Sequence, residues 1–374
     1  MGSSKRIAYF ISSHGLGHAA RAAAVMESVL SIEPSVRFDL FTTVPRWFFE
    51  DSVPGSFSYY ECETDIGLKQ EGPFRENLAE TLSRLDRFIP YEPDRIRRLS
   101  RRIAERDCRL ILCDISPMGI SAAKEAGIPS VLIENFTWDW IYAAYSKAQP
   151  GFESYIRWFE KLFDRADYRI QTEPVCLYRQ ADLSTRPVCR KPRRTAEEIR
   201  DSLGIGKSDP VIHITMGGIP GEYRIHDSLR RHPELTFMIS GGENGEVFTQ
   251  GNVIMLPYRS TFYHPDLIHA ADVVVGKAGY STLAEVYYAG VPFVFVNRPT
   301  FRESEILSRF ICERMNGLEI SADQFESGVW LEALPRLLQM PVVERPEKRG
   351  AVQAAEFLLR VAWSREHRAR EHGP

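Results

Sequence analysis

The sequence predicts an α/β protein built from two doubly wound domains. Short apolar runs alternate with longer amphipathic stretches along most of the chain, and its 374 residues suffice for two domains of ordinary size. The alternation pauses once, in the Pro- and Arg-containing segment 183–210. Strands that alternate with helices pair in parallel through right-handed crossovers, so each half of the chain is expected to form one parallel sheet covered by helices.

The apolar runs define the expected strands, and the stretches between them define the helices. An alanine-rich helix follows the first run, a strongly basic helix occupies 92–107, and another helix covers 280–290. The expected strands of the first half are 6–12, 37–43, 109–114, 129–135 and 167–173, and those of the second half are 210–217, 236–242, 252–258, 271–277 and 292–298.

The segment 183–210, where the alternation stops, sets the expected domain boundaries. Within it, Thr195 and Glu198 have the spacing of a capping box, which marks a helix start. We therefore expect an N-terminal domain over 1–190, a C-terminal domain over 195–345, and a final amphipathic helix over 346–374 that packs back on the N-terminal domain. In open α/β sheets ligands bind beyond the carboxyl ends of the strands, so two such domains are expected to face each other across a cleft.

Composition and charge exclude several classes of protein. The chain is 44% hydrophobic and 26% charged, as is typical of a globular protein, and its net charge of −3 gives no global reason to bind nucleic acid. No apolar run approaches the ~20 residues of a membrane span, so we expect neither a membrane-spanning helix nor a signal peptide. Six cysteines without a C-x-x-C pair argue against a zinc site or a disulfide framework and favour a cytoplasmic location.

The loop SSHGLGHAAR joins the first strand to its helix. Gly15 and Gly17 permit positive φ and the close approach of a ligand to the backbone. His18 lies on the first helical turn, with Arg21 one turn later on the same face, and an imidazole there suits the removal of a proton from an acceptor hydroxyl. His14 is the rival base. A histidine that only caps or packs the turn explains the pattern as well.

The segment 271–290 joins a strand to a helix in the second half. Gly279 makes the turn after Lys277, and the helix opens at about Ser281 and Thr282. Backbone N–H groups, two hydroxyls and a cation therefore form a cradle suited to a diphosphate. Glu285 follows one turn later, where a carboxylate can accept the vicinal hydroxyls of a ribose; the alternative is an exposed helix glutamate.

Two further loops are weaker candidates for the same ligand. Gly217 and Gly218 follow an expected strand and are suited to meet phosphates from the other side, although a plain strand-to-helix turn explains them equally well. Tyr258 lies in LPYRS at the end of another strand, where backbone groups can hold the edge of a base. An ordinary loop would contain the same residues.

These motifs resemble the GT-B family of nucleotide-sugar glycosyltransferases, which have two Rossmann-like domains. GLGHAAR and ADVVVGKAGYSTLAEVYYAGVP match the family's first-loop G-x-G-H and its second-domain G-x-x-T-x-x-E-x-x-x-x-G-x-P, in the same order and at the same separation. The segments HGLGHAAR, NFTWDWIYAAY, GKAGYSTLAE and PFVFVNRPTFRESEIL also resemble the glycosyltransferase-like N-terminal domains of plant arabinokinases. Kinase activity is not implied, since the sugar-kinase domain of arabinokinases has no counterpart in this sequence.

The resemblance implies a nucleotide diphosphate sugar, UDP-linked, bound by the C-terminal domain, and a hydroxyl acceptor bound by the N-terminal domain. It assigns Glu285 to the ribose, Ser281 and Thr282 to the phosphates, and His18 to the acceptor. No metal and no other cofactor is implied, because the helix dipole and backbone donors stabilise the leaving diphosphate.

The aromatic segment NFTWDWIYAAY contributes further candidates for the acceptor site, beside Gly15, Gly17 and Arg21. Aromatic faces stack on sugars, which suits Trp138, and Asn135 and Asp139 have groups that bind hydroxyls. Packing within the core explains the rings as well. Asp114, at the end of the strand 109–114, either orients a histidine or caps the following helix.

The prediction is therefore a glycosyltransferase that inverts the anomeric carbon by direct displacement. Glu303 and Glu305 stand in RESEILSR, where the peptidoglycan N-acetylglucosaminyltransferases read the donor sugar with Gln and Asn, so the donor sugar stays open. This acidic pair keeps a nucleotide-sugar 2-epimerase as an alternative, and a module that binds a nucleotide sugar without turnover is another. The basic helix 92–107 is interpreted as a solvated outer helix rather than as a membrane-surface element.

Overall fold

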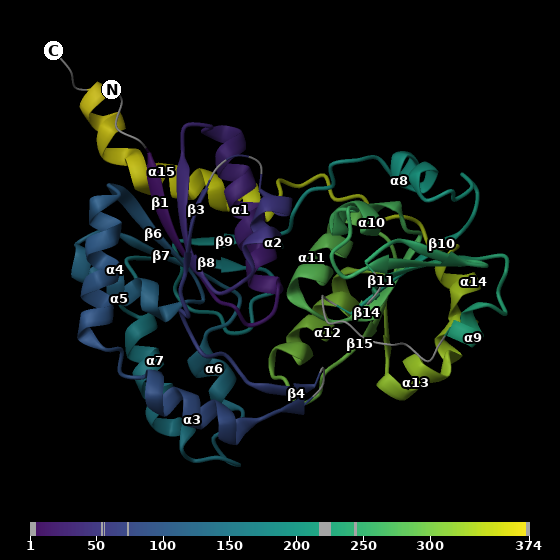
Figure 1. Ribbon diagram of the computed structural model, residues 1–374, viewed down its shortest axis with the longest axis horizontal. Helices are drawn as coiled ribbons and strands as arrows, with labels where there is room; N and C mark the ends of the chain where they lie inside the picture. Colours follow the sequence, from purple (N-terminus) through teal and green to yellow (C-terminus); the bar gives the residue numbers. More distant parts are fainter. Residues whose placement is uncertain are drawn as a thin grey trace. The chain divides into compact units, whose positions relative to one another are not determined.

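The computed structural model describes residues 5–53, 55, 57–72, 75–216, 226–242 and 245–371. The chain divides into two compact units, each with its own sheet and helices (Figure 1). Unit 1 comprises Met1–Cys189 and Lys348–Pro374, and unit 2 comprises Arg190–Glu347. The C-terminal segment thus returns to the unit in which the chain begins.

Unit 1 is built on a parallel sheet whose strand order, over the described residues, is β3-β2-β1-β6-β7-β8-β9. The chain adds strands outward from β1 to β3 and then crosses to β6 on the other side of β1, which is the doubly wound topology. The strands are β1 (Arg6–Ile11), β2 (Arg37–Thr42), β3 (Phe57–Glu61), β6 (Cys108–Asp114), β7 (Ser130–Glu134), β8 (Tyr168–Thr172) and β9 (Leu183–Thr185), and β4 (Gln70–Gly72) pairs with β5 (Arg75–Glu76).

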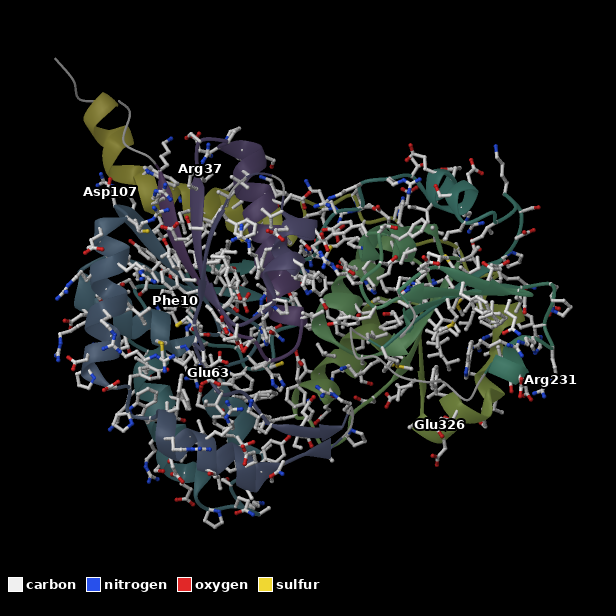
Figure 2. All side chains as sticks on the ribbon, viewed as in Figure 1. Phe10, Arg37, Glu63, Asp107, Arg231 and Glu326 are labelled. Atoms are coloured by element: carbon white, nitrogen blue, oxygen red, sulfur yellow. The ribbon has the colours of Figure 1, made fainter. Side chains whose placement is uncertain are left out.

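Helices cover both faces of this sheet. Alternate residues of β1 point to opposite faces, so Ile7 and Tyr9 join a core with α1 and α15, while Phe10 lies in the interior on the other face (Figure 2). Figure 2 also shows Arg37 and Asp107, which are exposed. The helices of unit 1 are α1 (Gly17–Ile32), α2 (Arg46–Ser52), α3 (Leu78–Phe88), α4 (Pro93–Glu105), α5 (Pro117–Ala126), α6 (Trp138–Ala143), α7 (Phe152–Phe163) and α15 (Gly350–Glu371).

Unit 2 repeats the topology. Its sheet, over the described residues, has the order β12-β13-β11-β10-β14-β15-β16, parallel except for the edge strand β12. The chain again reverses direction in the middle, between β10 and β14. The strands are β10 (Val211–Thr215), β11 (Thr236–Gly242), β12 (Phe248–Gln250), β13 (Val253–Pro257), β14 (Val273–Lys277), β15 (Phe293–Val296) and β16 (Gly317–Ile320).

Two apolar clusters hold the helices of unit 2 on its sheet. One contains Leu267 of α10, Leu283 of α11 and Leu307 of α12, and the other contains Phe325 of α13 and Leu334 of α14. The helices are α8 (Ala196–Ser202), α9 (His226–Leu229), α10 (His264–Ala270), α11 (Tyr280–Ala289), α12 (Glu303–Arg314), α13 (Ala322–Ser327), the 3₁₀ turn η1 (Val329–Ala333) and α14 (Leu334–Leu337).

The predicted fold class of two parallel α/β domains is confirmed, and each apolar run predicted as a strand forms one. The Thr195–Glu198 capping box is also present, with both reciprocal hydrogen bonds. The sequence interpretation missed the edge strands β3, β9, β12 and β16, because these are at most half-buried over most of their length and so lack a continuous apolar run. No helix within the described ranges combines the length and apolar character needed to cross a membrane.

The packing of α15 on α1 leads to a test of stability. Leu358 of α15 is fully buried in the core that contains α1. We expect Leu358→Ala to lower the free energy of unfolding by about 2–5 kcal/mol, as for other buried leucines. Denaturant unfolding measures this effect. The exposed neighbour Arg360 provides the control, and equal losses for Leu358→Ala and Arg360→Ala would contradict the assignment of α15 to the core of unit 1.

Candidate functional site

The strand order of unit 1 brings two predicted residues together. Because the chain leaves β1 and β6 in opposite directions, the loops after these neighbouring strands diverge and leave their carboxyl ends accessible to side chains. His18 lies in the first turn of α1, which follows β1, and Asp114 ends β6. Gly15, in the loop between β1 and α1, has φ +73°, a conformation that favours glycine, and an added Cβ would meet no atom within 4 Å.

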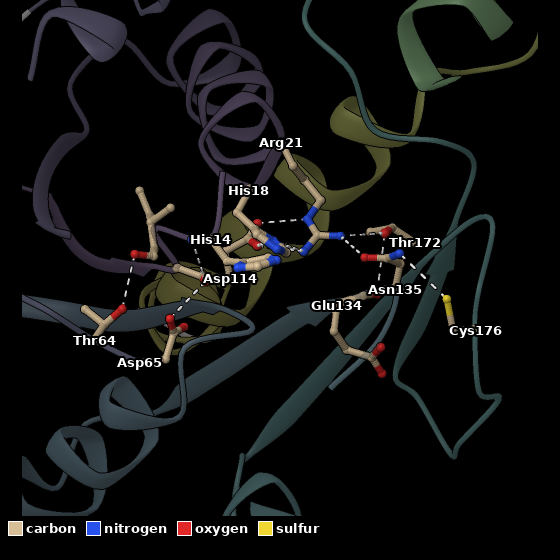
Figure 3. Close-up of polar contacts among 12 residues, drawn as sticks. His14, His18, Arg21, Thr64, Asp65, Asp114, Glu134, Asn135, Thr172 and Cys176 are labelled. Atoms are coloured by element: carbon tan, nitrogen blue, oxygen red, sulfur yellow. Dashed lines mark hydrogen bonds and ion pairs between the residues drawn. The ribbon is translucent and has the colours of Figure 1, made fainter. Parts of the chain in front are cut away.

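A buried hydrogen-bond network surrounds Asp114 (Figure 3). Arg21 binds the carboxylate with two donors, Nε at 2.8 Å from Oδ2 and Nη2 at 2.6 Å from Oδ1. The His18 Nδ1 lies 2.9 Å from Oδ1. Arg21 also donates through Nη1 to the Oδ1 of Asn135 at 2.7 Å. Helix α1 and the ends of β6 and β7 are thus joined through one guanidinium group.

The partners of His18 determine its tautomer. A carboxylate only accepts hydrogen bonds, so the 2.9 Å contact places a proton on Nδ1. The Nη2 of Arg21 lies 3.2 Å from the same nitrogen, but both groups are then donors, and this contact is not a hydrogen bond. The proton on Nδ1 leaves a lone pair on Nε2, which is the state that a general base requires.

Asp114 remains ionised at neutral pH. Burial by itself raises the pKa of this carboxyl, but the charge of Arg21 and hydrogen bonds from Arg21 and His18 outweigh it, so the pKa lies below its ordinary value. Ile115, the next residue, has φ 42°, which costs a β-branched side chain about 1–2 kcal/mol. Hydrogen bonds from Ile115 N to Ile133 O and from Ser12 N to Asp114 O hold this strained turn.

The structure places several predicted acceptor-site residues in the interior of unit 1. Trp138 is 0% exposed and packs against Phe136, Tyr142 and His14, so it offers no open face to a sugar. Asp139 is buried and binds Arg179. Buried side chains of this kind are placed to orient their neighbours, and their contact with an acceptor stays a prediction. The same applies to Arg21, Asp114 and Asn135, whose polar groups bind one another.

The geometry separates the two candidate bases. His14 is half-buried and makes an edge contact with Trp138 at 5.2 Å between ring centroids. His18 has the Asp114 carboxylate as a hydrogen-bond partner of its Nδ1. Gly17, predicted in the turn, is the first residue of α1. The Asp114 contact thus orients the His18 ring, while the choice between His18 and His14 as the base stays a prediction.

A residue that the sequence interpretation missed lies beside this network. Asp65 follows β3, is 3% exposed, and accepts a hydrogen bond from the Ser12 hydroxyl at 3.1 Å. Burial raises the pKa of this carboxyl from 3.8 to about 7, against the opposing effect of the Ser12 hydrogen bond. No motif marks Asp65, because its position depends on a loop that returns to the end of β1.

In unit 2, the predicted phosphate-binding turn also lies where the strand order reverses. Gly276 of β14 packs so closely on β10 that an added Cβ would lie 2.1 Å from the carbonyl oxygen of Thr215. Lys277 ends β14, and Gly279 precedes the first residue of α11 without a side-chain cap. Ser281 is half-buried and Thr282 is buried in the first turn. The start of α11 thus has backbone N–H groups available to an anion.

Lys277 contributes a half-buried ammonium to this turn. Burial lowers its pKa to about 8, with a further lowering from Arg298 and an opposing contribution from Glu303. No hydrogen bond or ion pair involves its Nζ in the described part of the chain. A half-buried cation beside a helix start is suited to an anionic ligand.

Glu285 is not the exposed glutamate of the alternative interpretation. It is buried and paired with two residues that sequence reasoning did not single out. The Nε and Nη2 of Arg190 both lie 2.9 Å from Oε1, and the Nδ1 of His264 lies 2.8 Å from Oε2. Burial raises the pKa of Glu285, but the charge of Arg190 and the contacts with His264 outweigh burial, so the net pKa lies below its ordinary value.

The remaining predicted donor residues are placed as follows. Gly217 and Gly218 lie outside the described residues. Tyr258 follows β13 and is 39% exposed. Glu303 is buried, whereas Glu305 is exposed and pairs with Arg309 on the next turn of α12, so the two carboxylates do not form an acidic pair. Across the described ranges, no three His, Cys, Asp or Glu side chains cluster as metal ligands.

Comparison with known proteins agrees with this architecture. Residues 228–306 match the glycosyltransferase family 28 C-terminal domain. This range includes the turn before α11 and Glu285. A UDP-glucosyltransferase from Polygonum tinctorium, capable of glucosylating indoxyl, superposes on this chain with a TM-score of 0.63 at 14% sequence identity. The superposition covers 96% of this chain and 99% of the glucosyltransferase chain. Such likeness confirms the GT-B fold.

Sequence relatives confirm the resemblance found from the motifs. The chain is 26% identical over 359 residues to the L-arabinokinase of Arabidopsis thaliana. The alignment covers 95% of this chain and 34% of that protein. It is 27% identical over 126 residues to the UDP-N-acetylglucosamine–N-acetylmuramyl-(pentapeptide) pyrophosphoryl-undecaprenol N-acetylglucosamine transferase of Bacillus licheniformis, over 32% of this chain and 34% of that enzyme. The chain spans about a third of the length of these curated relatives.

The raised pKa of Asp65 leads to a pH-dependent prediction. Between pH 3.8 and about 7 the folded protein holds a proton that the unfolded chain has released, so stability is lost as the pH rises through this window. At pH 8 the folded state keeps a buried charge. We expect Asp65→Asn to raise the thermal unfolding midpoint at pH 8 by at least about 2–4 °C and to have a smaller effect at pH 4.

Thermal unfolding of the wild type and of Asp65→Asn at both pH values measures this difference. The exposed Asp107→Asn serves as the control and is expected to change neither midpoint by a comparable amount. A fall in the midpoint of Asp65→Asn at pH 8 would show that the ionised Asp65 carboxylate stabilises the folded protein.

Proposed function

We propose that this chain, with its GT-B fold and its glycosyltransferase family 28 C-terminal domain, transfers a sugar from a UDP-linked donor to a hydroxyl acceptor. The observation that carries the proposal is the buried His18–Asp114 pair, which leaves one imidazole nitrogen as a proton acceptor beside the open loop of Gly15. We assign acceptor activation to unit 1 and donor binding to unit 2.

The donor assignment rests on the start of α11 and on the named relatives. An uncapped helix start, the Ser281 and Thr282 hydroxyls and the Lys277 ammonium together provide directed donors and positive charge for a diphosphate. The relatives and structural neighbours named above include a UDP-N-acetylglucosamine transferase and a UDP-glucosyltransferase, which supports uridine as the nucleoside. The proposal names no donor sugar. In the segment that reads the sugar in the peptidoglycan N-acetylglucosaminyltransferases, the buried groups here are Glu303 and Ser304.

The proposed reaction is a direct displacement with inversion. The acceptor hydroxyl loses its proton to Nε2 of His18 as its oxygen forms a bond to the anomeric carbon. The bond between that carbon and the diphosphate oxygen breaks, and the diphosphate leaves with the bonding pair. Asp114 stabilises the imidazolium that forms, while Lys277 and the N–H groups of α11 balance the charge on the leaving group, so the step needs no metal.

The two alternatives make different demands on the site. A 2-epimerase acts on the donor alone and needs acidic and basic groups around one sugar, and the outward orientation of Glu305 removes the acidic pair that favoured it. A module that only binds a nucleotide sugar needs no base, so the buried and strained environment of Asp114 would have no use in it.

Donor binding is tested by nucleotide-induced stabilisation. We expect UDP, in a screen with GDP, dTDP and ADP, to stabilise the wild type by about 2.7 kcal/mol at 100 times its dissociation constant. Glu285→Gln keeps the volume of the side chain and removes its charge, so the UDP-induced shift is expected to shrink. Each shift is measured from the variant's own ligand-free midpoint, and the exposed Glu326→Gln is the control. A screen in which no nucleotide stabilises the wild type contradicts the donor site.

Catalysis is tested at His18. We expect His18→Ala to lower kcat by about 10²–10⁴-fold, the usual contribution of a general base, with little change in the UDP-induced thermal shift. The half-buried His232→Ala in unit 2 is the control and should retain full activity. Sugar release from UDP-sugars is measured with an acceptor panel and without acceptor. An activity that persists unchanged in His18→Ala would assign the base elsewhere, and donor isomerisation without acceptor would favour the epimerase.

A further inference from the structure

We infer that His264 is a positioning residue that holds the Glu285 carboxylate in the orientation that binds the ribose of the donor. The inference rests on the proposed function, since it names the residue that prepares the nucleoside part of the same donor site. His264 opens α10, followed by Pro265, and it appears in none of the motifs that identify the site.

Both ring nitrogens of His264 are engaged. The Nδ1 lies 2.8 Å from Oε2 of Glu285, and the Nε2 lies 3.0 Å from the hydroxyl oxygen of Thr215 at the end of β10. A proton on Nδ1 serves the carboxylate, and the Thr215 hydroxyl then donates to Nε2. One imidazole ring therefore joins α11 to the end of β10. Because α11 follows β14, the ring links the two sides of the strand reversal in unit 2.

The contrast with His18 shows why this ring positions rather than reacts. Each histidine directs Nδ1 at a buried carboxylate that an arginine also binds, Asp114 with Arg21 and Glu285 with Arg190. The Nε2 of His18 has no hydrogen-bond partner in the described ranges, whereas the Nε2 of His264 has Thr215. A ring with both nitrogens occupied has no site left for a substrate proton.

The hydrogen-bond capacity of Glu285 shows which atom His264 controls. A carboxylate offers about four acceptor positions. Two donors of Arg190 occupy those of Oε1, and His264 occupies one of Oε2, which leaves a single position on Oε2 for a hydroxyl. The oxygen available to a ribose is therefore the oxygen that His264 holds.

The charged groups around His264 keep this arrangement. Glu285 faces it from α11, and Arg190 approaches from the segment before α8, with its guanidinium over the ring of Tyr263. His213 of β10 lies 5.5 Å away between ring centroids, and burial holds the pKa of His213 well below its ordinary value, so that neighbour is neutral. Asp266, in the first turn of α10, accepts a hydrogen bond from the backbone N–H of Arg193 instead.

The test compares two nucleotides that differ only in the hydroxyls that Glu285 would bind. Isothermal titration calorimetry gives Kd for UDP and for 2′,3′-dideoxy-UDP with the wild type, His264→Ala and His264→Asn. The exposed His269→Ala, on the same helix, is the control. A hydrogen bond to a charged group is worth about tenfold or more in affinity, so we expect the wild type to prefer UDP by about that factor.

In His264→Ala this preference should fall to about twofold or less, because the carboxylate loses the donor that fixes Oε2. His264→Asn places an amide N–H near the former Nδ1 and should restore most of the preference, and His269→Ala should behave as the wild type. His264→Gln places its amide near Thr215 instead and should not restore it.

The outcomes separate the inference from the function on which it rests. If the wild type binds neither nucleotide, the donor site itself is wrong. If the wild type prefers UDP and His264→Ala weakens both nucleotides equally, the ring has a general structural role and the inference is overturned. Recovery with Gln but not Asn would also overturn it, since the contact with Thr215 would then be the one that matters. Ligand-free melting of each variant identifies any loss of folding.

Discussion

The reversal of strand order in each sheet is the constraint on which the rest of the structure depends. Parallel strands that are added first to one side and then to the other leave two neighbouring strand ends from which the chain departs in opposite directions. In unit 1 these are the ends of β1 and β6, and in unit 2 the ends of β10 and β14. His18, Asp114, Thr215 and Lys277 all lie there. The candidate site residues therefore follow from topology before any of their chemistry is considered.

At both positions a buried carboxylate is compensated by an arginine and a histidine. Removing a charge from water costs several kcal/mol, and a buried ion pair is weak evidence for stability by itself. The pKa values of both carboxyls lie below their ordinary values because the arginine and the histidine at each position together outweigh burial. What distinguishes the two sites is the second nitrogen of each histidine, which accepts from Thr215 in unit 2 and has no partner in the described part of unit 1. In the proposed function, the same chemical unit supports a base in unit 1 and a fixed hydrogen-bond acceptor in unit 2.

Much of the architecture could be predicted from the sequence. The central strands could be located because a parallel strand buried on both faces is a continuous run of apolar residues. The start of α8 could be located because a capping box involves only residues three positions apart, here Thr195 and Glu198. The glycines of the first loop and the turn before α11 were recognisable for the same local reason. Edge strands such as β9 were not predictable, because a half-exposed three-residue strand has no distinctive pattern.

The sequence by itself determined the fold class, the loop that carries His18 and the turn that leads to Glu285, since each depends on residues close together along the chain. Only the tertiary structure decided which partners these residues have. Asp114 lies 96 residues from His18, and Arg190 lies 95 residues from Glu285, and no periodicity links such distant positions. The tertiary structure also decided that Trp138 is buried, that Glu303 and Glu305 point to different environments, and that Asp65 and His264 belong to the polar networks. These facts depend on packing and on the desolvation of charge, which exist only once the sheets have formed.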